Sequence, residues 1–233
     1  MIQVLLPDNK ERSLAFYLAM EEYVAKEMEG EAFFVWRVAP TVIIGRNQVL
    51  ENEVNMEYCM QHDVRLVRRR SGGGCVYSDK GNIMISYVSE RGDVTEVFDR
   101  YMSALERALC ALGLPAVKST RNDILVDGRK VSGNAFQQMP SKSIVHGTML
   151  YSTDLEALTE AIRPPVEKLK RHGVESVRQR VVNLEEYRHM HPVLESVETL
   201  EEYIVKSFTD REVVLTAGQV GEIERQAEPY IIR

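Results

Sequence analysis

"RNDILVDGRKVSGNAFQQ", residues 121–138, holds the strongest local fold signal of the chain. Two β-prone runs flank Asp127-Gly128, a dipeptide that favours a two-residue hairpin turn because both turn positions require positive φ. The stretch therefore predicts two antiparallel strands joined at this turn. A hairpin of this kind indicates that at least part of the sheet is antiparallel.

Further β-prone runs lie on both sides of this hairpin. AFFVWRV (32–38) and TVIIG (41–45) are separated by Ala39-Pro40, and this spacing predicts a strand pair with a tight turn. CVY (75–77) followed by NIMISYV (82–88) predicts a second hairpin. Two single strands are predicted as well, at residues 64–69 and 143–151.

Helical patterns separate the strands. Residues 11–28 carry an apolar stripe among charges, and residues 93–113 repeat apolar side chains at helical spacing, with Asp93 as N-cap and Gly113 as stop. Short helices are predicted at 52–62 and 154–162, and the chain beyond about residue 195 has a polar, helical pattern. We therefore predict an α+β fold, a mixed and largely antiparallel sheet flanked by helices, forming a single domain over residues 1–233.

Composition narrows the class of protein. A length of 233 residues can bury a substantial core, and a net charge of −6 argues against broad nucleic-acid binding. The three cysteines, Cys59, Cys75 and Cys110, form no CxxC pair, so neither a disulfide framework nor a zinc site is indicated. Without a signal-peptide pattern or an apolar run of roughly 20 residues, the sequence predicts a cytoplasmic protein with no membrane or nucleic-acid partner.

The segment RRRSGGGCVYSDKGN (68–82) places three arginines directly before three glycines. It matches neither the P-loop pattern nor the GxGxxG dinucleotide fingerprint. Two interpretations remain: a glycine-rich turn with solvated arginines, or a nest of backbone N–H groups that binds an anion with help from guanidinium. Arginines at 68, 69 and 70 alternate between the faces of a strand, so they cannot all serve one ligand.

Lys130 follows the hairpin turn and precedes Ser132-Gly133, where small residues leave room for a ligand against the strand. A lysine beside a turn is otherwise an ordinary surface residue. Asn122-Asp123, at the start of the same hairpin, could bind a metal or cap a turn. The residues alone do not decide whether Lys130 binds a ligand or is a surface residue, or whether Asn122-Asp123 binds a metal or caps a turn.

Four segments taken in order resemble the lipoate–protein ligase A family: residues 68–82, 121–138, HGTMLYSTDL (146–155) and KLKRHGVESVRQRVVNL (168–184). The resemblance covers roughly residues 12–185. It implies the catalytic domain of the biotin/lipoate ligase superfamily, which uses ATP and Mg²⁺ to convert lipoate to lipoyl-AMP. The lipoyl group would then pass to a lysine of a lipoyl-domain protein, either a 2-oxoacid dehydrogenase E2 subunit or the glycine cleavage H protein.

The resemblance also implies roles for individual residues. The family pattern RRxSGGG places Arg69 at the phosphate and Arg70 in the variable position, while Lys130 matches the lysine that holds the acyl carbonyl and a phosphate oxygen. Trp36 is implied to line the lipoate tunnel, its alternative role being a core residue, and Asp123 is the implied metal ligand. The remaining residues implied to bind ATP or lipoyl-AMP are Gly72, Gly73, Gly74, Cys75, Val76, Tyr77, Asn122, His146, Gly147 and Thr148. For His146 a structural hydrogen-bonding role is the alternative.

Other functions remain to be compared. An octanoyltransferase of the same fold would use a cysteine thioester, and in such relatives the nucleophilic cysteine follows the binding lysine. Residues 134–233 contain no cysteine, which favours the ligase and leaves Cys75 as the only candidate nucleophile, at an unexpected position. Biotin ligation is disfavoured because that family has a GRGRxGR glycine loop. A non-catalytic lipoyl-binding or carrier module is a third possibility, and formation of AMP from ATP would separate it from a ligase.

Many ligases of this family carry an additional C-terminal domain, whereas this sequence stops at Arg233. Two alternatives follow: the sequence is a truncated form that lacks the accessory domain, or the accessory domain is a separate protein. In a bipartite ligase the family implies that adenylation needs the accessory part, while transfer from preformed lipoyl-AMP does not.

Overall fold

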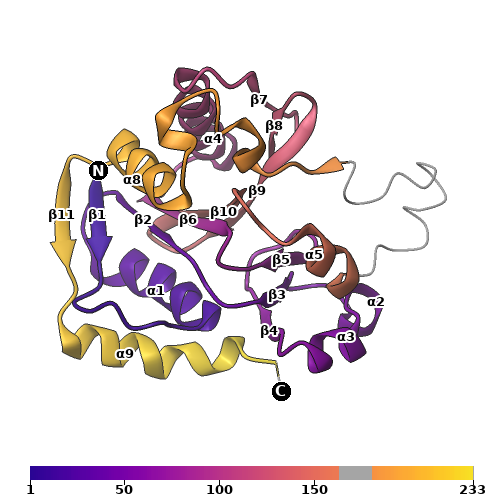
Figure 1. Ribbon diagram of the computed structural model, residues 1–233. Coiled ribbons are helices and arrows are strands. Elements are labelled where there is room, and N and C mark those ends of the chain that lie inside the picture. The colour runs from indigo at the N-terminus through magenta and orange to yellow at the C-terminus, as the bar shows by residue number, and fades with distance from the viewer. Residues whose placement is uncertain (163–179, 233) are drawn as a thin grey trace.

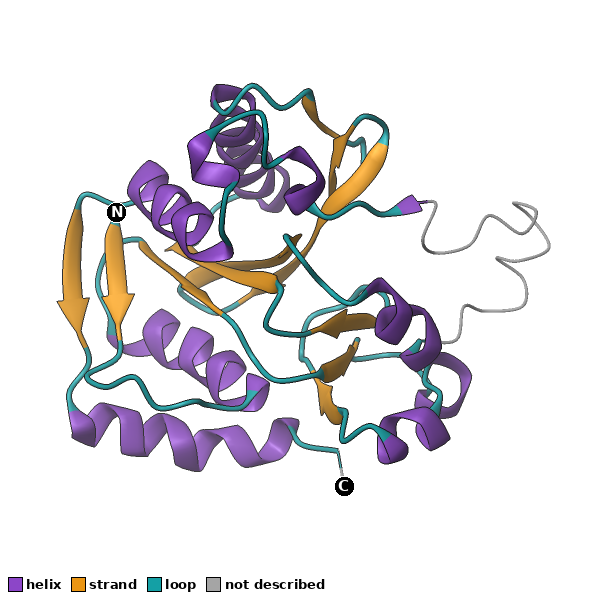
Figure 2. Ribbon diagram, in the orientation of Figure 1, coloured by secondary structure: helices purple, strands orange, loops and turns teal. Residues whose placement is uncertain are grey.

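The computed structural model describes residues 1–162 and 180–232. Two sheets and the helices around them make up this part of the chain (Figures 1 and 2). The predicted α+β class, with a mixed and largely antiparallel sheet, is confirmed. Most of the motif at 168–184 lies outside the described residues.

The larger sheet has eight strands in the order β11-β1-β2-β6-β10-β9-β8-β7. Both pairings of β1 are parallel, and every other neighbouring pair is antiparallel. The strands are β1 (Ile2–Leu5), β2 (Ala32–Trp36), β6 (Asn82–Glu90), β7 (Ala116–Lys118), β8 (Asp123–Val126), β9 (Arg129–Gln138), β10 (Lys142–Leu150) and β11 (Arg211–Val214).

Helices cover both faces of this sheet. On one face lie α1 (Leu14–Glu27) and α9 (Ala217–Ala227), and on the other lie α4 (Val94–Ala111) and α8 (Val197–Phe208) (Figure 1). Strand β6 shows the two-residue period directly, because Ile83 and Ile85 enter the core under α4 while Met84 enters the core under α1.

A second sheet has the order β4-β3-β5 and carries the glycine segment. Its strands are β3 (Thr41–Ile44), β4 (Arg65–Arg68) and β5 (Val76–Ser78), packed with α2 (Leu50–Glu53), α3 (Met56–Gln61) and α5 (Leu155–Ala161). Short 3-10 helices η1 (Leu184–Tyr187), η2 (Pro192–Leu194) and η3 (Glu228–Tyr230) complete the described elements.

Local signals in the sequence predicted several elements correctly. The hairpin of β8 and β9 turns at Asp127-Gly128, with φ of 49° and 74° as a type I′ turn requires. Asp93 caps α4 by accepting hydrogen bonds from the N–H groups of Thr95 and Glu96, and Gly113 has a φ of +81° just after the helix. Helices α1 and α5 and strands β4 and β10 also form where they were predicted.

Two of the three predicted strand pairings were wrong. Strand β2 pairs with β1 and β6 in the large sheet, whereas β3 pairs with β4 and β5 in the small sheet. The segment 37–40, ending in Pro40, leads from one sheet to the other, because proline has no N–H to continue a ladder. Strands β5 and β6 likewise belong to different sheets, so the run 75–88 is not a hairpin.

Two further differences concern single elements. The helix predicted at 52–62 is two helices, α2 and α3, because Val54 between them is extended and bridges to Ile162. Strand β11 interrupts a region predicted as helical, where it adds to the edge beside β1. No helix within residues 1–162 and 180–232 is long and apolar enough to cross a membrane.

Candidate active site

The three consecutive arginines at the end of β4 point to three different places. Arg68 donates to the carbonyl oxygens of Gly45 and Gln48, at 3.2 and 2.8 Å. Arg69 is buried under the glycine loop, and Arg70 forms an ion pair with Glu22 of α1 at 2.5 Å. The alternation expected for a strand therefore holds, and a single ligand cannot recruit all three side chains.

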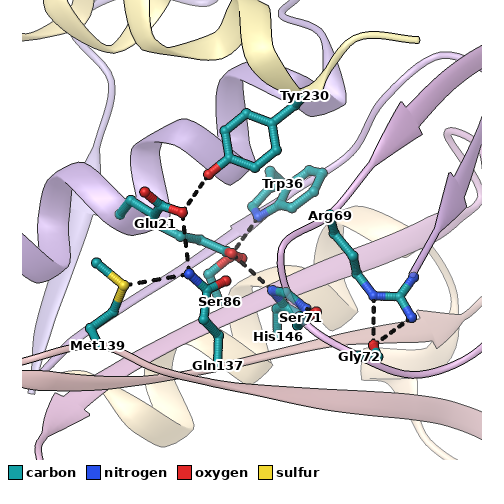
Figure 3. A network of polar contacts seen from close by, with 11 residues as sticks. Glu21, Trp36, Arg69, Ser71, Gly72, Ser86, Gln137, Met139, His146 and Tyr230 are labelled. Carbon is teal, nitrogen blue, oxygen red and sulfur yellow. Dashed lines mark hydrogen bonds and ion pairs between the residues drawn. The ribbon is translucent and has the colours of Figure 1, made fainter. Parts of the chain in front are cut away.

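Arg69 holds the carbonyl groups of the glycine loop (residues 71–74). Its Nε and Nη2 donate to the Gly72 oxygen at 3.1 and 2.8 Å (Figure 3). Nη2 also donates to the Gly74 oxygen at 2.7 Å. Because the C=O and N–H of a trans peptide point in opposite directions, these contacts turn the N–H groups of Gly73 and Cys75 away from the guanidinium. Burial lowers the pKa of Arg69 to about 10, so the side chain stays charged at neutral pH.

The glycines in and beside the loop differ in whether a side chain would fit in their place. Gly73 has a φ of +95°, and a Cβ there would lie 2.8 Å from Nη2 of Arg69. A Cβ on Gly45 would lie 2.3 Å from the Gly73 oxygen, so Gly45 lets the loop pack closely on β3. A Cβ added to Gly72 or Gly74 would have no atom of the described residues within 4 Å beyond its chain neighbours. The space next to these two residues is available to a ligand.

A buried chain of polar groups lies beneath the loop (Figure 3). Ser71 Oγ is 2.7 Å from Nε2 of His146, and Nδ1 of His146 is 2.9 Å from Oε2 of Glu21. The other oxygen of Glu21 accepts from Ser86 Oγ at 2.6 Å, and Ser86 accepts from the Trp36 indole N–H at 2.9 Å. With a proton on Nδ1 the imidazole donates to Glu21, and its Nε2 is then able to accept from the Ser71 hydroxyl.

These contacts place Trp36 and His146 on the α1 side of the large sheet. The Trp36 ring stacks on Tyr17, with centroids 4.5 Å apart, and is part of the apolar core there. His146 has the hydrogen-bonding role that was one of its two interpretations, and it connects the loop to α1. The proposed contacts of both residues with lipoate or its adenylate remain predictions.

Lys130 lies on β9 across from β8. Its Nζ is 2.7 Å from Oδ1 of Asp123, and the lysine side chain is 38% exposed. A Cβ on Gly133 would lie 2.6 Å from Nζ, so this glycine gives the lysine side chain its path across the strand. The backbone carbonyl of Lys130 accepts from the N–H of Val182 at 3.0 Å.

Asn122, Gly147 and Thr148 brace the neighbouring strands. The amide of Asn122 donates to the Asn134 carbonyl at 2.7 Å, and Asn134 returns a hydrogen bond to the Asn122 carbonyl at 3.1 Å. A Cβ on Gly147 would lie 1.9 Å from Oδ1 of Asn134, so only glycine fits there. Thr148 Oγ1 lies 3.3 Å from the N–H of Gly133, beside Lys130. The ligand contacts predicted for these three residues remain predictions.

A cleft of about 690 Å³ opens beside the loop, between α4, the segment before β8 and the end of β9. Gly72, Gly73 and Asn122 line it, together with the aromatic rings of Phe98 and Phe136. The described residues that line this cleft do not include Trp36, His146 or Lys130. The structure therefore brings the glycine loop and Asn122 to one cleft and leaves the other predicted ligand contacts outside it.

Cys75, Val76 and Tyr77 continue from the loop into β5. Burial raises the pKa of the Cys75 thiol to about 12, which keeps it protonated at neutral pH. A thiol in this state is a poor nucleophile. Val76 packs against the core under α1. Tyr77 is buried in the core of the small sheet, and burial raises the pKa of its hydroxyl above the ordinary value.

The acidic side chains near the loop offer few ligands for magnesium. Within residues 1–162 and 180–232, no three His, Cys, Asp or Glu side chains lie together as metal ligands. Asp123 offers a carboxylate, although Lys130 already pairs with it. Mg²⁺ is usually held by one or two carboxylates together with substrate phosphates and water. A metal held mainly by phosphates and water would need no more protein carboxylates than Asp123 offers, and the role of Asp123 as a metal ligand remains a prediction.

The residue pattern did not single out several side chains of this site. Glu21 and Glu22 fall on the face of α1 that is buried, at 1% and 4% exposure, although a carboxylate is normally solvated. Ser71 reaches Glu21 through His146 and Tyr230 contacts Glu22 directly, and no sequence motif links these residues. Two acidic residues inside an otherwise apolar helical stripe are the one available signal in the sequence.

The chain is an α+β protein with a mixed sheet between two helical layers. A small second sheet carries a glycine loop whose carbonyls are held by Arg69. The model of the lipoyl protein ligase A/B catalytic domain matches residues 13–209. The chain belongs to this family.

Individual relatives agree. The chain is 38% identical over 173 residues to lipoate–protein ligase 1 of Staphylococcus aureus, covering 73% of this chain and 53% of that protein. It is 36% identical to a lipoate–protein ligase of Bacillus subtilis, again over 173 residues, covering 73% of this chain and 52% of that protein. The chain thus spans about half the length of the curated relatives it matches.

Solved structures show the same fold. A bi-partite lipoate protein ligase from Thermoplasma acidophilum, described with its E2 lipoyl domain, superposes with a TM-score of 0.83 at 26% identity, covering 97% of this chain and 91% of that chain. A lipoate-protein ligase A bound with ATP superposes with a TM-score of 0.82 at 24% identity, covering 97% of this chain and 94% of that chain. A T. acidophilum protein with bound lipoic acid gives 0.79 at 25% identity, with 97% and 94% covered.

Proposed function

We propose that this chain activates lipoate with ATP to lipoyl-AMP and transfers the lipoyl group to a lysine of a lipoyl domain. The observation that carries the proposal is the glycine loop, whose carbonyls are held by Arg69 in a chain of the lipoyl ligase family. With those carbonyls directed inward, the N–H groups of Gly73 and Cys75 are free to face an anion. Both substrates, lipoate and ATP, are anions.

The proposed chemistry has two steps. In the first, a lipoate carboxylate oxygen attacks the α-phosphorus of ATP and pyrophosphate leaves. In the second, the neutral amine of the acceptor lysine attacks the acyl carbon, AMP leaves and the amine loses a proton. Each step builds negative charge on oxygen atoms, and fixed N–H donors and cations stabilise that charge in the transition state.

Lys130 is the proposed cation at the reacting atoms. Its ammonium group would leave Asp123, 2.7 Å away, and bind the acyl carbonyl oxygen and a phosphate oxygen. Gly133 leaves the space in which the side chain can move across the strand. In this role Lys130 stabilises charge and is not the acyl acceptor. Mg²⁺, when bound, would neutralise charge on the pyrophosphate, with Asp123 as a protein ligand.

The proposed acceptors are lipoyl-domain proteins, namely the E2 subunits of 2-oxoacid dehydrogenases and the glycine cleavage H protein. Support for this class comes from the similar T. acidophilum ligase, which is described with its E2 lipoyl domain. The free cysteines support the proposed cytoplasmic location, because reduced thiols are typical of that compartment.

A second candidate is a transfer-only module that needs a partner protein for adenylation. The observation that favours it is the likeness to a bi-partite ligase, which the chain matches over 91% of that chain's length. An octanoyltransferase is less well supported, since it would need a reactive cysteine and the Cys75 thiol has a pKa of about 12.

The deciding experiment incubates the chain with ATP, Mg²⁺, lipoate and an apo lipoyl domain, followed by intact-mass measurement of the acceptor. A parallel sample receives synthetic lipoyl-AMP in place of ATP and lipoate, and a third receives octanoyl carrier protein. An acceptor whose target lysine is replaced by arginine is the control. We expect a lipoyl group on the lysine acceptor with lipoyl-AMP. An unmodified acceptor in both lipoyl samples would refute the proposal, and modification only by octanoyl carrier protein would identify an octanoyltransferase.

A further inference from the structure

Two consecutive carboxylates of α1 hold the two residues that directly precede Gly72. Glu21 reaches Ser71 through His146, as described above. Glu22 reaches Arg70 directly, with its Oε2 2.5 Å from Nη1. Both carboxylates are almost completely buried, and a buried polar group is costly unless it has hydrogen-bond partners. The stem of the glycine loop is thus tied to α1 at two adjacent positions.

The Glu22 carboxylate has a further partner from the far end of the sequence. The hydroxyl of Tyr230, in η3, donates to Oε1 of Glu22 at 2.6 Å. Gln137 of β9 donates to the same oxygen at 3.2 Å, so Tyr230 and Gln137 meet at one carboxylate (Figure 3). The Arg70 guanidinium also lies over the Tyr230 ring, 5.0 Å from its centroid. Tyr230 therefore contacts both members of the Glu22–Arg70 ion pair.

The segment that carries Tyr230 is also attached to β4. Ile231 bridges to Val67, and the N–H of Ile232 donates to the Leu66 carbonyl at 3.1 Å. The strand leading into the loop is thus held at its backbone by 231–232 and at its end by Tyr230. These two attachments use different atoms and different residues.

The charge state of Glu22 agrees with this geometry. Burial raises the pKa of its carboxyl, but the hydrogen bonds from Tyr230 and Gln137 and the nearby Arg70 outweigh burial and lower the pKa below its ordinary value. The group is therefore ionised at neutral pH and accepts from Tyr230, Gln137 and Arg70, while Nζ of Lys26 lies 3.5 Å from its Oε2.

We propose that Tyr230 is a positioning residue for the glycine loop. By donating to Glu22 and lying under Arg70, it fixes the end of β4 and hence the direction in which residues 71–74 leave the strand. Without the hydroxyl, the Glu22 carboxylate loses a donor and the ion pair is free to rotate toward water. The loop then spends less time in its binding conformation, which weakens ligand affinity in proportion. The assignment of the ligand as an adenylate rests on the proposed function.

Tyr230→Phe is the decisive variant, because it keeps the ring and its contact with Arg70 and removes only the hydroxyl. The matched control is Tyr203→Phe, which removes the hydrogen bond from a partly buried tyrosine on α8 to the Ala108 carbonyl, at 2.8 Å. Hydrogen exchange of peptides covering residues 71–77 is measured in the ligand-free proteins by mass spectrometry. Affinity for lipoyl-AMP is measured separately by calorimetry.

In Tyr230→Phe we expect the loop amides to exchange about three- to tenfold faster, the scale set by the net contribution of one typical hydrogen bond. The dissociation constant for lipoyl-AMP should rise by a similar factor, while the transfer rate at saturating lipoyl-AMP stays within about twofold. Tyr203→Phe should change neither loop exchange nor affinity. Glu22→Gln should reproduce the loop effect, and combining it with Tyr230→Phe should add little, because both variants disrupt the same contact.

Loop exchange in Tyr230→Phe equal to that in Tyr203→Phe would overturn the positioning role. The same conclusion follows if Glu22→Gln and Tyr230→Phe act additively. Because exchange is measured without ligand, its result does not depend on which reaction the chain catalyses. Failure of the unaltered chain to bind lipoyl-AMP would instead refute the proposed function, and faster exchange in Tyr230→Phe would still support the loop contact.

Discussion

Lys130 is a single charge with two competing anionic partners, the Asp123 carboxylate and the proposed acyl-adenylate. We predict that Lys130→Ala loses both half-reactions, because one well-placed donor at developing charge is worth roughly 10²–10³ in rate. Lys130→Arg should recover little, since the larger planar head does not fit the path over Gly133. Formation of AMP and transfer from lipoyl-AMP are the two measurements.

The neighbouring Arg129 supplies the control for Lys130. It lies in the same hairpin and pairs with Glu186 at 3.1 Å on the surface, so Arg129→Ala should keep both half-reactions close to the unaltered rates. If Lys130→Ala behaved like Arg129→Ala, Lys130 would be an ordinary surface residue of the hairpin.

Arg69 and Arg70 differ in what they hold, although they are adjacent. Arg69→Lys keeps the charge but loses the planar fork that binds the Gly72 and Gly74 carbonyls together. We predict that it weakens ATP use at least about tenfold. Arg70→Lys should be much milder, because an ammonium can still pair with Glu22. Steady-state kinetics with varied ATP tests this, and equal losses at the two positions would contradict it.

Cys75 follows the loop directly and carries a thiol with a pKa of about 12. Since the thiolate is the reactive form, we predict that iodoacetamide at neutral pH modifies the exposed Cys110 and leaves Cys75 unmodified. Cys75→Ala should keep transfer from lipoyl-AMP close to the unaltered rate. Peptide mass spectrometry gives the modification at each cysteine. Loss of transfer in Cys75→Ala, together with rapid modification of Cys75, would reopen the thioester mechanism.

At the scale of elements, the glycine loop combines a tightly packed side and an open side. A Cβ added to Gly74 would meet no described atom within 4 Å beyond its chain neighbours, so Gly74→Val should leave the fold nearly intact and abolish adenylate binding by filling the ligand space. Calorimetry with lipoyl-AMP and a thermal unfolding scan measure these two effects. Gly45→Val is the contrasting variant, because its side chain would collide with the loop backbone and should lower the melting temperature. Unchanged affinity in Gly74→Val would refute the anion-binding loop.

The sequence predicted elements whose signals are local. The Asp127-Gly128 turn and the Asp93 cap each depend on residues within a few positions, so pattern and structure agree. Strand partners depend on which apolar faces meet in space, and neighbouring runs such as 32–38 and 41–45 carry no information about that choice. Strand β11 was missed because its four residues are exposed, so they show no alternation of apolar and polar side chains.

The difference between local and distant contacts also explains which parts of the site were predictable. The glycine loop and Lys130 lie in short motifs, so the sequence singled out both as candidates, and their ligand contacts remain predictions. Glu21, Glu22 and Tyr230 act through contacts between distant segments, the Tyr230–Glu22 contact joining residues 208 positions apart. No motif connects such residues, and a buried glutamate is chemically identical in the sequence to a solvated one.

For the whole molecule, the coverage of its relatives leads to a prediction about the two half-reactions. The chain matches a bi-partite ligase over nearly its full length and spans about half of the curated relatives. We predict that the chain alone transfers lipoate from synthetic lipoyl-AMP faster than it forms lipoyl-AMP from ATP. Single-turnover measurements of both steps test this. ATP-dependent formation of lipoyl-AMP at a rate matching transfer would show that no partner is needed.

The arrangement of β1 between β2 and β11 has a consequence for synthesis on the ribosome. Strand β11 and helix α9, which pair with residues 2–5 and cover helix α1, are translated some 200 residues after them. Until then one edge of β1 is unpaired and part of the apolar face of α1 is uncovered, and Glu22 lacks the Tyr230 hydroxyl. Nascent chains therefore pass through a long interval in which this half of the domain exposes an unpaired strand edge and apolar surface, and the contact of Tyr230 with Glu22 forms only after residue 230 has been translated.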